Sequence, residues 1–142
     1  MGGYPQEHEG YTLLEVDDGD ETRRVFGFEE PGGLGVGEIT RGELTMCVFG
    51  TDAHFHQITL TERDYERCAR LLGAADSPED AGDLVCQLRI WFGATGFFLS
   101  DLMDLLDREG VRYGYLNDCR GAGVSYHAVN GFGGEEGHLR LV

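Results

Sequence analysis

The sequence predicts an α+β domain: an antiparallel β-sheet, built from an N-terminal meander and C-terminal strands, covered on one face by about three helices. Two observations support this prediction. Apolar residues alternate in the first part of the chain, recur with a helical period in the middle, and alternate again after Gly110. Short strands joined by short, glycine-rich turns favour antiparallel pairing of neighbours.

Five strands are expected before the first helix. Asp17-Asp18-Gly19-Asp20 follows the first, Pro31-Gly32-Gly33 follows the second, and Thr40-Arg41-Gly42-Glu43 joins the third and fourth as a hairpin. The expected strands are Tyr11–Val16, Arg23–Phe28, Val36–Ile39, Leu44–Phe49 and His54–Leu60.

Three helices follow, each with an apolar face. The first lies between Thr61 and Gly73, the second begins at Ser77 with Pro78 at its first position, and the third runs from Gly96 to Glu109. The inward positions are Tyr65, Cys68, Ala69 and Leu72, then Ala81, Leu84, Val85, Leu88 and Trp91 or Phe92, then Phe98, Leu102, Leu105 and Leu106.

Three further strands are expected at the C-terminal end, with a loop over Asn117–Gly121 between the first two. They cover Val111–Tyr115, Val124–Val129 and His138–Val142. We expect residues 1–142 to form a single domain in which 1–9 and 131–137 are flexible.

The charge balance restricts the class of partner. With 26 acidic and 11 basic side chains the net charge is −15, which repels a phosphate backbone and excludes direct nucleic-acid binding through a basic face. The acidity is either functional or a background of composition, since net charge alone does not distinguish these.

Location is inferred from what the chain lacks. The N-terminal region has no basic segment followed by an apolar one, and no apolar run reaches the roughly twenty residues of a membrane span. The four cysteines are isolated, and Cys68 and Cys86 occupy helical positions expected to face the core. We therefore expect a cytoplasmic protein with reduced thiols, no membrane contact and no cofactor.

Common catalytic and nucleotide-binding motifs are missing. Gly35-x-Gly37 is followed by Thr40 where a dinucleotide fingerprint needs glycine, and a chain without lysine cannot form a Walker A loop. Ser125 and His127 share a strand face but have no nucleophile elbow.

His54 and His56 are the candidate metal ligands. Alternate residues of a strand point to one face, so two imidazoles there can share an ion. The other interpretation is that both are partly buried histidines on the face that carries Ile58 and Leu60. The possible third ligands are Asp52, Glu62, His127 and His138.

Asp101, Asp104 and Asp107 form the candidate partner-binding site. Their spacing keeps them on the outer face of the third helix, and Asp118 beyond it extends the negative ridge. A ridge of this kind suits a groove built for phosphates, although a solvated helix face has the same pattern.

These observations favour an acidic, non-catalytic inhibitor that binds and blocks a basic nucleic-acid-handling protein, of the anti-CRISPR or anti-restriction type, with nucleic-acid mimicry as one mode of inhibition. In general character the chain is similar to the small acidic inhibitors of mobile elements and toxin systems, but it carries no motif of a known family. One alternative is an immunity protein that neutralises a nuclease or deaminase toxin. Another is a small metal-dependent enzyme or ligand-binding domain that uses His54 and His56.

Overall fold

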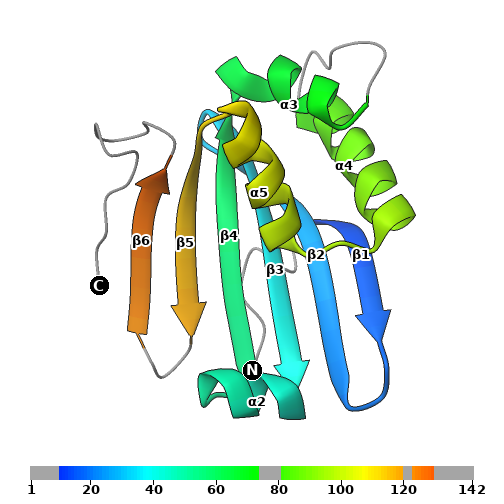
Figure 1. The fold of residues 1–142 in the computed structure, drawn as a ribbon, viewed down its shortest axis with the longest axis vertical. Helices are drawn as coiled ribbons and strands as arrows, with labels where there is room; N and C mark the ends of the chain where they lie inside the picture. The colour runs from blue at the N-terminus through cyan, green and yellow to red at the C-terminus, as the bar shows by residue number, and fades with distance from the viewer. Residues whose placement is uncertain (1–9, 74–80, 120–122, 130–142) are drawn as a thin grey trace.

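A six-stranded antiparallel sheet, whose strands lie side by side in chain order, is the framework of the computed structural model (Figure 1). The structure describes residues 10–73, 81–119 and 123–129, with side chains described within 10–73 and 84–117. The strands are β1 (Tyr11–Asp17), β2 (Glu21–Glu30), β3 (Gly33–Gly42), β4 (Ala53–Thr61), β5 (Tyr113–Cys119) and β6 (Gly123–Val129). The α+β class and the antiparallel meander are confirmed.

The helices that follow β4 and precede β5 in the sequence pack on one face of the sheet (Figure 1). A 3₁₀ turn, η1 (Glu62–Asp64), leads into α3 (Tyr65–Leu71), which is followed by α4 (Ala81–Thr95) and α5 (Leu99–Glu109). The predicted helices are confirmed in the part of the chain that the structure describes, but the third begins at Leu99 rather than Gly96. Phe98, which was expected to face the core, precedes this helix and is 51% exposed. The predicted start at Ser77 lies outside it.

The main core fills the space between these helices and the sheet. Leu84, Leu88 and Phe92 of α4 are fully buried, as the helical period predicts, so Phe92 rather than the half-buried Trp91 continues the apolar stripe. The sheet contributes the alternating residues that face the helices, among them Val25, Leu34, Val36, Ile58, Leu60 and Tyr113.

The glycines of β3 make room for a second cluster on the other face of the sheet. Phe26, Phe28 and Phe55 are buried there together with Ile39. A Cβ at Gly35 would lie 2.4 Å from the Phe28 ring. The glycine-rich segment is therefore a strand in which neighbouring aromatic rings occupy the space above the glycines.

The predicted strand Leu44–Phe49 and its hairpin are wrong, because this segment is the helix α2 (Glu43–Phe49) at the lower end of the sheet (Figure 1). Gly42 and Gly50, with φ of 140° and 78°, bracket the helix. The carboxylate of Glu21 on β2 accepts hydrogen bonds from the backbone N–H groups of Leu44 and Thr45. This cap from a distant strand outweighs the preference of the segment for β-structure.

Other expectations differ in detail. Residues Asn117–Cys119 continue β5 rather than starting a loop, because they pair with both β4 and β6. Cys86 is exposed, whereas Cys68 is buried with its thiol pKa raised to about 12 by burial and by the charge of Asp64. The predicted strand His138–Val142 and the flexible segments 1–9 and 131–137 lie outside the described residues.

The cysteines that the structure describes with side chains, Cys47, Cys68 and Cys86, are free thiols. Among the helices of the described chain, none combines the length and apolar character that a bilayer crossing requires.

The glycine and aromatic packing of β3 can be tested by a matched pair of substitutions. We expect Gly35→Ala to lower the free energy of unfolding by about 1–3 kcal/mol, because the new methyl group overlaps the Phe28 ring. Gly93→Ala on α4, where no atom lies within 4 Å of the new Cβ, should raise it by roughly 0.5–1 kcal/mol. Urea denaturation measures both, and equal stability of Gly35→Ala and the parent chain would contradict this packing.

Candidate functional site

Polar residues replace apolar ones on the helix-covered face of the sheet, at the end nearest α2. Arg23, Glu38 and His56 continue the positions that Val25, Val36 and Ile58 occupy further along β2, β3 and β4. Glu38 and His56 are directly opposite each other in the register. Strand alternation therefore places these polar side chains on the face that forms the main core.

The carboxylate of Glu38 is the centre of this group. Its Oε2 atom accepts hydrogen bonds from the Arg23 guanidinium at 3.2 Å and from the backbone N–H of Leu99 at 3.1 Å, and its Oε1 atom lies 2.8 Å from His56 Nε2. Arg23 also donates to the carbonyl oxygens of Gly96 and Phe97. Glu38 and Arg23 thus fasten the connection between α4 and α5 to the sheet.

Burial of the Glu38 carboxyl favours its neutral form, but its neighbours favour the charged form more strongly. The hydrogen bond and charge of His56, the Leu99 N–H and the Arg23 charge together hold its pKa below the usual value. Glu38 is therefore a carboxylate, 5% exposed, at neutral pH.

The two histidines lie side by side, with ring centroids 5.4 Å apart. His56 bridges Glu38 and the Tyr115 hydroxyl, which is 2.9 Å from Nδ1. His54 Nε2 lies 2.6 Å from Asn117 Oδ1, and the ring of Phe49 stacks on the imidazole with centroids 3.7 Å apart. Both ring nitrogens of His56, and Nε2 of His54, thus form hydrogen bonds with protein side chains.

The metal hypothesis receives no third ligand from the residues described with side chains, where no group of three His, Cys, Asp or Glu side chains is arranged around a common point. Asp52 and Glu62 do not join the histidines in such a group. The side chains of His127 and His138 lie outside the described set. His54 and His56 do share a face with Ile58 and Leu60, as expected.

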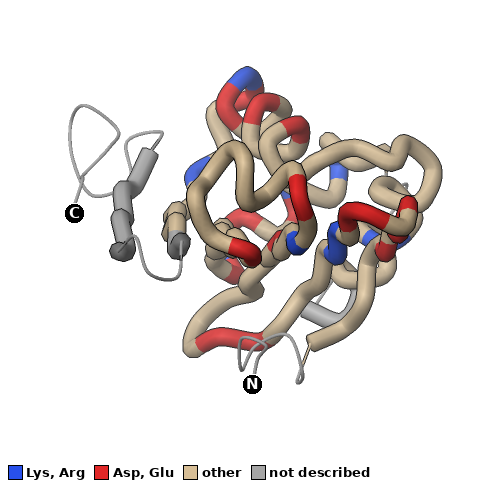
Figure 2. Tube along the Cα trace, turned by 90° about the horizontal axis from the view of Figure 1, so that it is seen from below, with Lys and Arg blue, Asp and Glu red and all other residues tan. Residues whose placement is uncertain are grey.

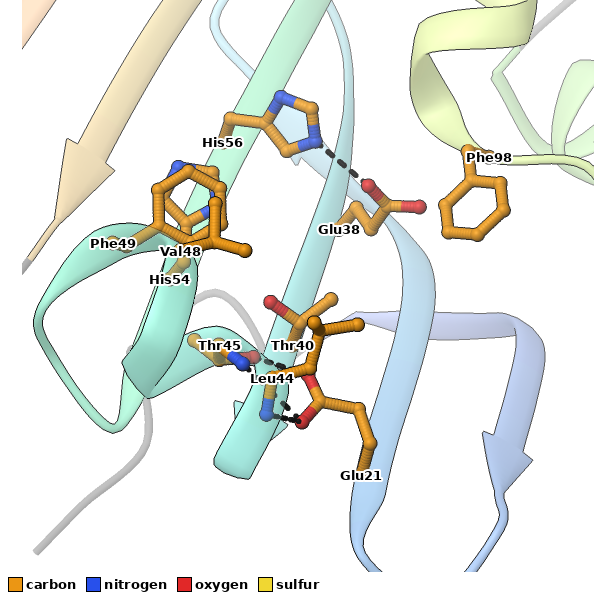
Figure 3. Close-up of a pocket in the computed structure, with 10 residues that line it drawn as sticks. All are labelled: Glu21, Glu38, Thr40, Leu44, Thr45, Val48, Phe49, His54, His56 and Phe98. Carbon is orange, nitrogen blue, oxygen red and sulfur yellow. Dashed lines mark hydrogen bonds and ion pairs between the residues drawn. The ribbon is translucent and has the colours of Figure 1, made fainter.

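A pocket of about 230 Å³ opens between α2 and the connection that precedes α5 (Figure 3). Its walls are the apolar side chains of Leu44, Val48, Phe49 and Phe98. The polar lining residues are Glu21, Glu38, Thr40, Thr45, His54 and His56. It is the point where the buried polar group reaches the surface.

The acidic face of α5 is present, but its members differ. Asp101 accepts a hydrogen bond from the Phe98 N–H at 2.8 Å and caps its own helix. Asp107 accepts a hydrogen bond from the hydroxyl group of buried Tyr113 at 2.9 Å, and burial together with this hydrogen bond raises the Tyr113 pKa. Asp104 is exposed and forms no hydrogen bond or ion pair within the described residues.

Asp118 lies in β5, opposite Phe55, and its side chain is outside the described set. Sequence reasoning missed Arg23, Glu38 and the pocket lined by α2. A usable signal was present, because Arg23, Glu38 and His56 interrupt the alternating apolar pattern on three neighbouring strands.

Comparisons with known proteins add no relative: no family model matches the chain, and neither a curated protein nor a solved structure is significantly similar to it.

The ionised state of Glu38 has a testable effect on stability. We expect Glu38→Gln to cost roughly 2–4 kcal/mol at pH 7, because Arg23 loses its buried countercharge. The folded pKa is lowered, so this contribution is fully present above the unfolded pKa of about 4 and is lost as the pH falls through the lower folded value. The measurement is the difference in unfolding free energy between parent and variant from pH 7 to pH 3.

Glu66→Gln is the matched control, since Glu66 is exposed and paired with Arg70 on the same helix. It should cost no more than about 0.5 kcal/mol. If the difference in unfolding free energy between the parent protein and Glu38→Gln stays constant down to pH 3, Glu38 is not a charged partner in the folded protein.

Proposed function

We propose that this protein is an acidic, non-catalytic inhibitor that binds and blocks a basic nucleic-acid-handling protein in the cytoplasm. The observation that carries the proposal is the charge excess. Even if each of the 11 basic side chains paired with one of the 26 acidic ones, 15 acids would have no cationic partner. Acidic segments lie on several elements in the view onto the α2 end (Figure 2).

An apolar surface beside these acids supports a protein as the partner. We define the α2 surface as Leu44, Met46, Val48, Phe49 and Phe98, which are all exposed, Leu44 by 63% and Val48 by 62%. Apolar side chains at the centre of a polar rim are typical of protein interfaces.

The rim of the α2 surface is acidic. The Glu43 N–H donates to the Asp20 carbonyl, so the turn between β1 and β2 lies against the start of α2. Asp18, Asp20 and Glu43 are exposed there. This combination favours a basic protein surface over nucleic acid, which the same charges repel.

The experiment is capture followed by competition. The immobilised chain is used to isolate a binding protein, which is identified, purified and assayed for nucleic-acid binding with and without the chain. We expect a basic partner whose nucleic-acid binding is lost at a stoichiometric ratio. A partner that keeps its nucleic-acid binding while the chain is bound would overturn the proposal. A secreted nuclease or deaminase toxin as partner would identify the inhibitor as an immunity protein.

The acidic face of α5 should contribute to the association rate. We expect Asp104→Asn to lower the on-rate at low salt by roughly twofold, because long-range attraction steers the encounter with a basic partner. The triple variant, in which Asp101, Asp104 and Asp107 are all changed to Asn, should lower the on-rate by up to about tenfold. The effect should shrink at 0.15 M salt, where the Debye length is about 8 Å. Kinetics of binding to the identified partner at two salt concentrations measure it.

Asp104→Asn is the informative variant, because Asp101 and Asp107 also support the fold and their loss lowers stability. Unchanged on-rates and salt dependence in the triple variant would show that this helix face is ordinary solvated surface.

A second candidate is a small metal-dependent enzyme or ligand-binding domain, favoured by the place of His54 and His56 in the pocket lining. It predicts stoichiometric metal in the purified protein and its loss in the variant with both histidines changed to Gln. The inhibitor proposal predicts no stoichiometric metal, since the His56 nitrogens already bond to Glu38 and Tyr115. Elemental analysis of the two proteins distinguishes the candidates.

A further inference from the structure

We infer that the pocket between α2 and Phe98 receives an arginine side chain of the basic partner. This inference rests on the proposed function and names the contact that would give it specificity. The pocket opens to solvent within the α2 surface, because Leu44, Val48, Phe49 and Phe98 line it. Its volume of about 230 Å³ is smaller than that of most sites for drug-sized ligands, about 300–1,000 Å³. A single long side chain fits this size better than a cofactor does.

The charges of the pocket select a cation. Among the described residues, its lining contains the carboxylates of Glu21 and Glu38 and no arginine (Figure 3). Glu38 is already matched by Arg23 and His56. Glu21 accepts hydrogen bonds from the backbone of α2 and from the Thr45 hydroxyl, but it forms no ion pair within the described residues. Within the described residues, Glu21 is therefore a carboxylate at the pocket that is bound by the start of α2 but by no cationic side chain.

The walls favour a cation with an apolar stem. Leu44 and Val48 present aliphatic surface to the stem, while Phe49 and Phe98 present aromatic rings. Long basic side chains bury their methylene groups against such surface and keep the charged end at a polar partner.

The protein itself contains an example of this recognition. The Arg23 guanidinium carbon lies 4.0 Å from the centroid of the Phe98 ring while the same group donates to Glu38. A planar guanidinium stacks on aromatic rings and pairs with carboxylates, whereas a lysine ammonium is a compact, strongly hydrated charge. The pocket therefore favours arginine over lysine.

The first test uses a small probe on the intact chain. Nα-acetyl-arginine methylamide is titrated into protein labelled at Leu and Val methyl groups, with the lysine and norleucine analogues as matched probes. We expect saturable NMR shifts at Leu44 and Val48 with the arginine probe, at least threefold weaker affinity for the lysine probe, and no saturation with norleucine. Equal affinity for arginine and lysine probes, or no saturation with either, would overturn the inference.

Substitutions locate the probe. Glu21→Gln keeps an oxygen that can cap α2 and should weaken the arginine probe at least threefold. Val48→Ser changes a side chain that is 62% exposed, so the fold is retained, and it should weaken the probe by a similar factor. Asp104→Asn, an exposed acid outside the pocket lining, should leave the affinity unchanged. An equal loss in Asp104→Asn and Glu21→Gln would show that the probe responds only to overall charge.

The identified partner separates this inference from the proposed function. We expect Glu21→Gln and Val48→Ser to raise its dissociation rate at least fivefold, whereas Asp104→Asn alters mainly the association rate. Unchanged dissociation in both pocket variants, with inhibition intact, would overturn the arginine pocket and leave the inhibitor standing. A chain that blocks no basic protein would instead overturn the function on which the pocket's biological role rests.

Discussion

The buried carboxylate of Glu38 connects three parts of the molecule that are far apart in the sequence. It binds Arg23 on the preceding strand, His56 on the following strand and the N–H of Leu99 at the start of α5. Burying the charges of Glu38 and Arg23 costs solvation free energy, and this cost is offset only when each of their donors and acceptors has a hydrogen-bond partner. The pocket lined by α2 begins at this group, because Glu38 and His56 also belong to its lining.

Elements that depend on local patterns could be predicted from the sequence, whereas those that depend on distant residues could not. The stripe of Leu84, Leu88 and Phe92 is enough to predict α4, because its period is contained in the segment itself. The helix α2 depends on a cap from Glu21, a residue of another strand, so its apolar sequence indicated a strand instead. The same limit applies to the site: His54 and His56 could be found from their spacing, but Arg23 and Glu38 join them only through the sheet register.

The acids of α5 show why a charge pattern alone does not define a surface. Asp101 accepts a hydrogen bond from the backbone at the start of its own helix, and Asp107 accepts one from the hydroxyl of Tyr113. Helical spacing placed all three aspartates on one face, but it could not distinguish residues with an internal partner from Asp104, which has none among the described residues. A pattern of like charges therefore combines residues kept for the fold with residues free to attract a partner.

Attraction by charge and recognition by shape are carried by different parts of this molecule. Spread-out acids increase the rate at which a basic protein arrives, and they disfavour acidic partners by repulsion. Discrimination requires a contact that a wrong partner leaves unfilled or unpaired. The α2 surface can supply it, because its apolar side chains line a pocket in which Glu38 is held by hydrogen bonds to His56 and to Arg23. Side chains that buried hydrogen bonds already hold in place lose little conformational entropy when a partner binds. More of the interaction free energy of the contact therefore contributes to affinity for the correct partner.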